Sequence, residues 1–398
     1  MNPGSPRPAF HAMQGKSFLV ITFCLLLHHG CRRPGKEPID ALPSPAESPM
    51  PADAGPPVMD EAADAKDAKD AKPQKPQLPV EDAPPIPEYV HERDLKQASP
   101  GEWIDIRNTG ATEKLMLEGK LVWGRTKTKV KILKRVGDDV KRVIFLGEID
   151  GEGRTIKVQI KVPQESYNEW RGEIHAYNLG KKLGLPLPPV VLRTFKRSDF
   201  ARARNAMTEE EMEIIDWSGK SSERVEGSVR YWVESLNPRK VGGKVADEEY
   251  LQQAAAALHP ANRASLVEDY KPYLDLGRMF VFDYLIYNND RARNLGTMVF
   301  PDGSVKLILF DHGLAFGIQN KSKKISFDYL DSMQMLPADM LEVLETMTRP
   351  QLDDLLDAGT NNRLRLKETV ISQLWDRRGE IVDKAQELRA RWGEAAFY

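Results

Sequence analysis

The amino-acid sequence predicts an α+β protein of two lobes, with a β-rich N-terminal lobe and a helical C-terminal lobe. Runs of β-branched and aromatic residues that are typical of strands dominate residues 121–233. From about Asp247 onward the apolar residues recur at helical spacing, with one exception near residues 298–310. Strands that precede helices along a chain are typical of the α+β class.

The composition excludes several functional classes before any motif is considered. The 398 residues carry a formal net charge of −2, whereas nucleic-acid binding requires a basic excess. The two cysteines, Cys24 and Cys31, both lie in the N-terminal hydrophobic region. The rest of the chain therefore has no thiol for a disulfide, a cysteine–zinc site or a cysteine nucleophile.

Residues 1–31 are typical of a bacterial signal peptide with an imperfect lipobox. Ten uncharged residues, Phe18 to Leu27, follow the basic residues Arg7 and Lys16. This run is too short to span a bilayer but suits a signal-peptide core. A small residue precedes Cys31, which resembles the lipobox of bacterial lipoproteins. We therefore expect lipidation at Cys31 and export to the bacterial cell envelope, in the membrane or periplasm; ordinary cleavage and retention are the alternatives.

Residues 32–88 have the composition of a disordered linker rich in Pro, Ala, Asp and Lys. The segment holds fourteen of the chain's 28 prolines, three copies of Asp-Ala-Lys and no aromatic residue. It has too little apolar surface to offset the entropy of an ordered chain, so we expect a semi-stiff spacer. The folded part then comprises an N-lobe over 89–235 and a C-lobe over 236–398.

The N-lobe elements follow from periodicity and turn chemistry. Lysines at every second position of residues 125–133 lie on one face of a predicted strand. That face is either solvated or directed at nucleotide phosphates. Strand-like runs at 143–146 and 156–162 flank Asp-Gly-Glu-Gly at 150–153, which predicts a hairpin. The other predicted elements of this lobe are a helix over 169–184 and strands over 190–192 and 229–233.

The chemically informative side chains concentrate between residues 282 and 316. An apolar helix is predicted to end at Asn288, and the polar loop after it carries Asp290 and Asn294. A hairpin with an Asp-Gly turn then leads to Asp311, at the end of an apolar strand. Because a hairpin returns the chain to its start, we expect Asp311 to lie close to Asn294. Two such oxygen ligands suit Mg²⁺ or Mn²⁺ carrying nucleotide phosphates.

This segment resembles the catalytic core of kinases. Residues 282–291 read Phe-Asp-Tyr-Leu-Ile-Tyr-Asn-Asn-Asp-Arg, and residues 311–317 read Asp-His-Gly-Leu-Ala-Phe-Gly. The chain is thereby similar to the secreted four-jointed and Golgi casein-kinase-like kinases, and more distantly to type II phosphatidylinositol kinases and persistence-toxin kinases. The resemblance implies a two-lobed protein-kinase-like fold and ATP-dependent transfer of phosphate to a protein or glycan hydroxyl. It also implies that Asp290 accepts the substrate proton and that Asp311 and Asn294 bind Mg²⁺ or Mn²⁺.

The same resemblance assigns two residues of the N-lobe. Lys161 ends a predicted strand, and Glu173 lies in the helix that follows; kinases use such a pair to hold the ATP phosphates. Considered without the motif in the downstream loop, a lysine and a glutamate at this spacing would indicate at most a surface ion pair worth under about 1 kcal/mol. Lys157, on the same face of the strand, is the alternative lysine. No Gly-x-Gly-x-x-Gly precedes Lys161, so the loop that covers the phosphates is not assigned.

Residues 225–236 come where a kinase chain passes between its lobes. The resemblance implies that backbone groups near Glu234 and Ser235 contact adenine, and an ordinary core strand is the alternative. Two other functional hypotheses stay open: an inactive kinase-like surface lipoprotein that binds nucleotide or a partner, and a surface lipoprotein whose carboxylates bind only Ca²⁺ or a partner. The expected partners are ATP, a protein or glycan acceptor and a membrane reached through the lipid, without nucleic acid.

Overall fold

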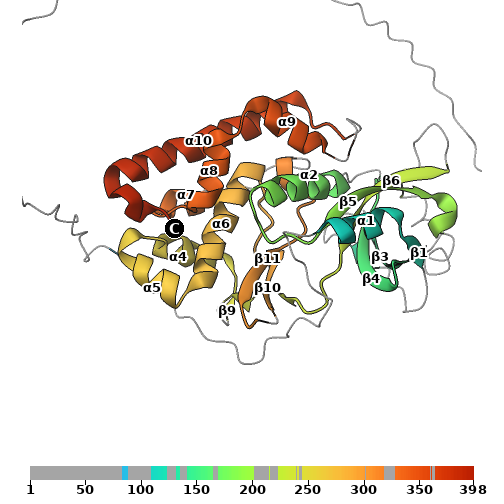
Figure 1. The fold of residues 1–398 in the computed structure, drawn as a ribbon, viewed down its shortest axis with the longest axis horizontal. Helices are drawn as coiled ribbons and strands as arrows, with labels where there is room; N and C mark the ends of the chain where they lie inside the picture. Colours follow the sequence, from blue (N-terminus) through green and yellow to red (C-terminus); the bar gives the residue numbers. More distant parts are fainter. Residues whose placement is uncertain are drawn as a thin grey trace, which may run out of the picture. The chain divides into compact units, whose positions relative to one another are not determined.

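The computed structural model describes residues 83–87, 109–122, 131–134, 141–164, 169–200, 215, 223–238, 240–241, 244–300, 302–317, 328–358, 360 and 364–398. All of them belong to one compact unit, Lys72–Tyr398 (Figure 1). The predicted signal peptide, the lipidation site Cys31 and the predicted linker as far as residue 82 lie outside the described residues. So does most of the lysine-rich strand predicted at 125–133.

A six-stranded antiparallel sheet forms the first half of the described unit. Its main order is β1-β3-β4-β6-β5, and β2 also pairs with β3. The strands are β1 (Lys120–Val122), β2 (Lys131–Lys134), β3 (Lys141–Gly151), β4 (Arg154–Lys161), β5 (Val190–Lys196) and β6 (Arg224–Tyr231). The strands predicted at 143–146, 156–162 and 190–192 are therefore confirmed to within a residue. The strand predicted at 229–233 is confirmed only in part, because β6 begins at Arg224 and ends at Tyr231.

The β3–β4 hairpin turns two residues later than its Asp-Gly signal suggests. Asp150 and Gly151 are still paired with β4, and the turn is made by Glu152 and Gly153, with φ of 51° and 77°. A two-residue turn that matches strand twist needs positive φ at both central residues. Gly153 supplies one of them at little steric cost, so the second glycine marks the turn.

Two helices accompany the sheet. Helix α2 (Glu169–Lys182) buries Trp170, Ile174 and Tyr177 on one face, as its apolar spacing predicts. Gly184 follows with φ of 69°, the left-handed conformation expected of a glycine after a helix C-terminus. Helix α1 (Gly110–Glu118) has no counterpart among the predicted elements, and it packs against β3 and β5.

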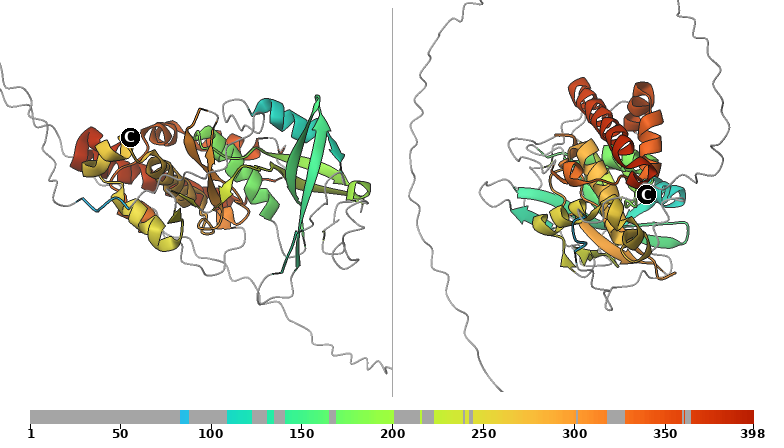
Figure 2. Two further views of the ribbon diagram at one scale, coloured as in Figure 1. Left: turned by 90° about the horizontal axis from the view of Figure 1, so that it is seen from below. Right: turned by 90° about the vertical axis from the view of Figure 1, so that its left-hand side faces the viewer.

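The second half of the unit is helical, and Figure 2 shows its helices at the opposite end from the six-stranded sheet. The α-helices are α4 (Glu248–Ala257), α5 (Arg263–Glu268), α6 (Lys271–Ile286), α7 (Asp328–Ser332), α8 (Ala338–Thr346), α9 (Arg349–Asp357) and α10 (Glu368–Trp392). Short 3-10 helices occur at Arg197–Phe200, Pro260–Asn262, Ala315–Gly317 and Gly393–Ala396. Among the described residues, no helix combines the length and apolar character needed to cross a bilayer.

Two small sheets interrupt the helices. Strand β10 (Leu295–Val299) pairs with β11 (Val305–Leu309) on one side and with β7 (Asn237–Pro238) on the other, and β8 (Lys240–Val241) pairs with β9 (Lys244–Val245). The β10–β11 pair is the hairpin predicted between Asn294 and Asp311. Its register pairs Leu295 with Leu309, which brings the ends of the hairpin together.

The largest apolar core extends from α2 through the helical half to the C-terminus. A second core lies under the six-stranded sheet. Ala83–Pro87, in the range predicted as linker, also contacts the helical half. Asn262 donates a hydrogen bond to the carbonyl of Pro84 at 2.8 Å, and the Tyr273 hydroxyl donates one to the carbonyl of Pro87 at 3.0 Å.

Candidate active site

The loop after α6 is anchored by a buried ion pair. The Arg291 guanidinium donates to both carboxylate oxygens of Asp283, each at 2.7 Å. The Asn288 side chain donates to one of the same oxygens at 2.9 Å. Both ends of the pair are buried and fully hydrogen-bonded, which compensates the cost of removing the charges from water. The pair therefore fixes the loop to the helix.

Asp290 and Asn294 meet in this loop. The Asn294 amide nitrogen donates to the backbone carbonyl of Asp290 at 2.7 Å and to its carboxylate at 3.1 Å. Both residues are partly exposed. The two hydrogen bonds use the amide nitrogen of Asn294, which orients the side chain and leaves its amide oxygen for another ligand.

The hairpin carries Asp311 to the same region. The backbone N–H of Phe310 donates to the carbonyl of Asn294 at 3.1 Å, so the residue before Asp311 contacts the loop directly. Arg291 reinforces this join, because its Nη1 donates to the carbonyls of both Asn294 and Phe310. Asp311 itself has φ of 59°, a left-handed conformation that aspartate adopts more readily than most residues.

Lys161 joins Glu173 and Asp311. Its ammonium group donates to Glu173 at 2.6 Å and forms a still shorter ion pair with Asp311, 150 residues away in sequence. The Lys161 and Glu173 side chains are 5% and 1% exposed, whereas the Asp311 side chain is 34% exposed. The other oxygen of Glu173 accepts a hydrogen bond from the backbone N–H of His312 at 3.2 Å. The sheet, α2 and the segment after β11 thus converge on one charged cluster.

The cations around Asp311 keep its carboxyl group ionised. Burial raises the pKa of Asp311, but the charges of Lys161 and Arg230 outweigh burial and lower that pKa below its ordinary value. The neighbouring His312, by contrast, is kept in its uncharged form. Burial, together with the Arg291 and Arg230 charges, lowers the pKa of His312 well below its ordinary value, so its ring is neutral and contributes no further cation.

Arg230 belongs to this cluster and was not predicted. It lies on β6, its side chain is 8% exposed, and its Nη1 is 3.7 Å from a carboxylate oxygen of Glu173. Its guanidinium carbon is 5.6 Å from the centre of the Phe310 ring. The sequence shows only an arginine inside a strand. Its place beside Glu173 depends on the pairing of β4 with β6, which no local pattern specifies.

Three other predicted residues lie apart from the charged cluster. Lys157, the alternative lysine, forms an ion pair with Glu234, and both side chains are about half exposed, at 43% and 51%. Ser235 is buried in the segment after β6. That segment runs beside β4, since the backbone N–H of Trp232 donates to the carbonyl of Lys157 at 2.9 Å.

The strand register places Lys161 in one row with residues of β3 and β2. Lys161 pairs with Ile144 on β3, and Ile144 pairs with Lys131 on β2. The β2–β3 connection at 135–140 starts three residue pairs further on, beyond Lys134 and Lys141. This connection lies outside the described residues, so the loop that would cover phosphates stays unassigned.

The oxygen ligands of the site fit Mg²⁺ or Mn²⁺. Asp311 offers an ionised, partly exposed carboxylate, and Asn294 offers an amide oxygen from the loop joined to the same hairpin. No group of three or more His, Cys, Asp or Glu side chains that could hold a metal occurs in the described part of the chain, so the site would rely on one carboxylate and one amide. Two protein ligands suit Mg²⁺, which usually keeps several waters and binds together with substrate phosphates.

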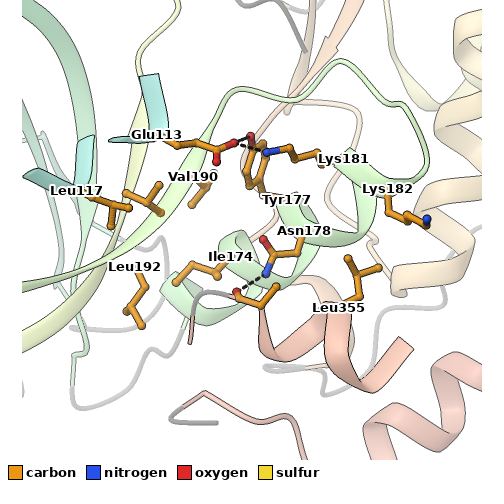
Figure 3. Close-up of a pocket in the computed structure, with 12 residues that line it drawn as sticks. Glu113, Leu117, Ile174, Tyr177, Asn178, Lys181, Lys182, Val190, Leu192 and Leu355 are labelled. Carbon is orange, nitrogen blue, oxygen red and sulfur yellow. Dashed lines mark hydrogen bonds and ion pairs between the residues drawn. The ribbon is translucent and has the colours of Figure 1, made fainter. Parts of the chain in front are cut away.

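A separate pocket of about 520 Å³ lies on α2 (Figure 3). It is lined by side chains of α1, α2, β5 and α9, among them Glu113, Tyr177 and Lys181. Glu113 accepts a hydrogen bond from Lys181 at 2.6 Å. The pocket includes none of the charged residues described above, so it shares only helix α2 with the candidate site.

Comparisons with known proteins identify the fold. No protein-family model matches the sequence, and no curated protein matches it. The structure of hydra Fam20 with sugar aligns with a TM-score of 0.50 and 17% identity, over 77% of this chain and 95% of that chain. The Golgi casein kinase aligns with a TM-score of 0.51 and 16% identity, over 74% of this chain and 79% of that chain.

The described unit is therefore a two-lobed, kinase-like α+β domain, as the sequence predicts. The resemblance to the four-jointed and Golgi casein-kinase-like kinases is confirmed at the level of the fold. The chemistry has to be argued from the residues of this chain, because a shared fold does not by itself imply a shared function.

Proposed function

We propose that this protein is a kinase that transfers the γ-phosphoryl group of ATP to a hydroxyl of a protein or glycan. The observation that carries the proposal is the convergence of Lys161, Glu173 and Asp311 from three distant segments. A buried lysine held by a buried glutamate, beside an aspartate that follows a hairpin, supplies the charges that phosphoryl transfer requires.

Asp290 would be the catalytic residue in this proposal. Its partly exposed carboxylate accepts the proton of the acceptor hydroxyl, while the hydrogen bond from Asn294 holds the carboxylate in place. The bond from the acceptor oxygen to the γ-phosphorus forms as the bond to the β–γ bridging oxygen breaks, and ADP leaves. Because the transferred group needs little covalent help, positioning and charge stabilisation supply most of the rate.

The remaining residues would bind the nucleotide and the metal. Lys161, positioned by Glu173, holds phosphate oxygens, and Asp311 with Asn294 holds Mg²⁺ or Mn²⁺. The metal, when bound, neutralises negative charge on the phosphates. Backbone groups near Glu234 and Ser235 would contact adenine; the course of this segment beside β4 supports their role.

The acceptor is proposed from the chemistry named in the comparisons. One structure with this fold is described with sugar and the other as a casein kinase. A hydroxyl of a glycan or of a protein serine or threonine is therefore the acceptor that we would test first.

The decisive experiment measures phosphate transfer by the full chain and by two variants. Asp290→Ala and Asp311→Ala should each abolish transfer from ATP to casein or to a glycan acceptor in Mg²⁺ or Mn²⁺. Asp302→Ala is the matched control, because Asp302 lies in the turn of the same hairpin and bonds only to Ser304 among the described residues. Equal activity in all four proteins would refute the assignment. ATP binding without transfer would instead support an inactive kinase-like binding protein.

We also propose that the chain is exported and lipidated at Cys31. The proposal is supported by the short apolar run and the small residue before that cysteine. Expression in a bacterium with labelled palmitate should label the wild type and Cys24→Ala but not Cys31→Ala. Equal labelling of both variants, or none in any protein, would refute lipidation at Cys31.

A further inference from the structure

Arg230 lies on the same face of the sheet as Lys161. The register pairs Lys161 with Ser228 and Gln159 with Arg230. Directly opposite residues of antiparallel strands share a face, and so do residues two apart on one strand. All four side chains are therefore on one face, and all four are buried although they are polar. Buried polar side chains are normally hydrogen-bonded, so each of these side chains, next to a proposed phosphate-binding lysine, should have a hydrogen-bond partner.

One nitrogen of the Arg230 guanidinium lacks a hydrogen-bond acceptor among the described residues. Its Nη1 is buried and makes no hydrogen bond to any described residue. The carboxylate oxygen of Glu173 is 3.7 Å away, and that oxygen already accepts from Lys161 at 2.6 Å. Gln159, directly opposite, likewise has a buried amide oxygen without a partner. Leaving a buried donor unpaired is unfavourable, because the group has given up its hydrogen bonds to water, so a ligand that supplies an acceptor would be stabilised here.

The charges around Arg230 indicate what kind of acceptor fits. Glu173 and Asp311 carry two negative charges, and Lys161 and Arg230 carry two positive charges. Once Asp311 is shared with a divalent metal, the site gains net positive charge and can take an anion. Arginine always carries its charge and its planar fork of N–H donors matches phosphate oxygens.

We propose that Arg230 is a second phosphate-binding residue, whose Nη1 donates a hydrogen bond to a phosphate oxygen of the nucleotide held by Lys161. The inference rests on the proposed function, because it takes a nucleotide as the ligand of the site. It assigns to Arg230 a direct contact with the ligand and no role in proton transfer. Lys161 and Arg230 then divide the phosphate charge between them, and Glu173 holds Lys161 in place.

The test compares binding of ATP, ADP and adenosine to the full chain in Mg²⁺ by calorimetry. Removing one charge-assisted hydrogen bond, worth about 1.5–3 kcal/mol, should weaken ATP and ADP binding by about 10- to 150-fold in Arg230→Gln. Adenosine binding should change less than about twofold, since adenosine has no phosphate. Arg230→Lys should recover part of the loss.

A matched control separates this contact from a loss of structure. Arg193, on neighbouring β5, donates to the carbonyls of Met116 and Gly119 at 2.9 and 2.8 Å. Arg193→Gln should destabilise the fold without changing the ratio of ATP to adenosine affinity. If Arg230→Gln does not fold, Gln159→Glu serves instead, because a carboxylate opposite Arg230 should capture its Nη1 and weaken ATP binding selectively.

Several outcomes would overturn the inference. An unchanged affinity for ATP and ADP in Arg230→Gln would show that water satisfies Nη1. An equal loss for adenosine would show a general disturbance of the site, and a lower kcat with unchanged affinity would show that Arg230 acts through Glu173. Failure of phosphate transfer in the wild type is a different result: it refutes the proposed function, whereas binding of ATP and adenosine still decides the role of Arg230.

Discussion

Two buried charge clusters in this domain differ in how completely their polar atoms are paired. In the first, Asp283 and Arg291 bond to each other, and the remaining hydrogen bonds go to Asn288 and to backbone carbonyls. In the second, Lys161 and Glu173 are buried, Asp311 is 34% exposed, and Arg230 keeps an unpaired donor. The first cluster connects α6 to the loop and hairpin directly after it. The second connects residues as far apart in sequence as Lys161 and Asp311, and of the two clusters only the second has bonding capacity left for a ligand.

The difference distinguishes buried charges that stabilise the fold from buried charges that can bind a ligand. A fully satisfied network fixes one geometry and gains nothing from a ligand. A network with an exposed carboxylate and an unpaired donor retains capacity that a bound anion and cation can use. We therefore expect substitutions in the first cluster to reduce stability and substitutions in the second to reduce activity.

The largest effect is expected from Asp311→Asn. Phosphate transfer should fall by about 10³-fold or more, the scale seen when a group that stabilises transition-state charge is lost. The protein should stay folded with a lower thermal unfolding temperature. Lys161 and Arg230 lose an anionic partner, whereas asparagine tolerates the left-handed backbone at this position. Kinetics and thermal unfolding of the same preparation provide the check, and an inactive protein that is also unfolded would contradict the comparison.

Asp283→Asn should have the next largest effect, on stability. Loss of this carboxylate leaves Arg291 buried and uncompensated, which costs about 3–5 kcal/mol of unfolding free energy. Asp339→Asn is the matched control. Asp339 also pairs with an arginine, Arg278, but its side chain is 65% exposed, so chemical denaturation should show a loss below about 1 kcal/mol.

Gly172→Ala should disturb the second cluster through the backbone. A Cβ atom at Gly172 would lie 2.7 Å from the carbonyl oxygen of His312 and 2.9 Å from that of Gly313. These are backbone atoms, which cannot avoid the clash by changing rotamer, so α2 should shift and displace Glu173. We expect kcat to fall by about 10-fold or more. Gly379→Ala, in α10 with open space around it, should instead stabilise the protein by about 0.5–1 kcal/mol. Equal kcat in both variants would contradict this account.

Asp275 should give a smaller, pH-dependent effect on stability. Burial raises its pKa to about 6, against opposing contributions from the Leu307 N–H and the charges of Arg278 and Lys306. The unfolded chain has a pKa of about 3.9, so the folded state favours the protonated form. Its stabilising contribution is full below about pH 4 and is lost as pH rises to about 6. Asp275→Asn should remove this loss, which is about 2–3 kcal/mol at pH 7 for a shift of about two pKa units; unfolding at pH 4 and 7 tests it.

Lys157→Ala should have the smallest effect. Its ion pair with Glu234 is about half exposed, and exposed pairs contribute under about 1 kcal/mol. ATP affinity should be nearly unchanged, whereas Lys161→Ala should lose it. A large loss of ATP affinity in Lys157→Ala would reverse the choice between the two lysines.

The sequence sufficed for the features that local pattern and motif specify. The hairpin between Asn294 and Asp311 was predicted from an Asp-Gly turn between apolar runs, and the structure confirms it. The pairing of Lys161 with Glu173 was implied by the resemblance to kinases, and the structure shows it. The ion pair of Lys161 with Asp311 joins residues 150 positions apart, and no local pattern specifies it.

The features that were missed depend on tertiary pairing. Arg230 reaches Glu173 only because β6 pairs with β4 in one register, and a strand's own sequence does not name its partner. Helix α1, which precedes the first predicted strand, was missed because only Leu115 and Met116 of it are buried. Ala83–Pro87 was assigned to the linker by composition, yet Asn262 and Tyr273 bond its carbonyls.

The left-handed backbone of Asp311 determines which substitutions the chain tolerates at this position during evolution. Its φ of 59° suits asparagine and glycine as well as aspartate, and either codon is one base away from an aspartate codon. A single point mutation can therefore remove the proposed metal-binding carboxylate without straining the backbone. Folded but inactive descendants are consequently within easy mutational reach of this protein.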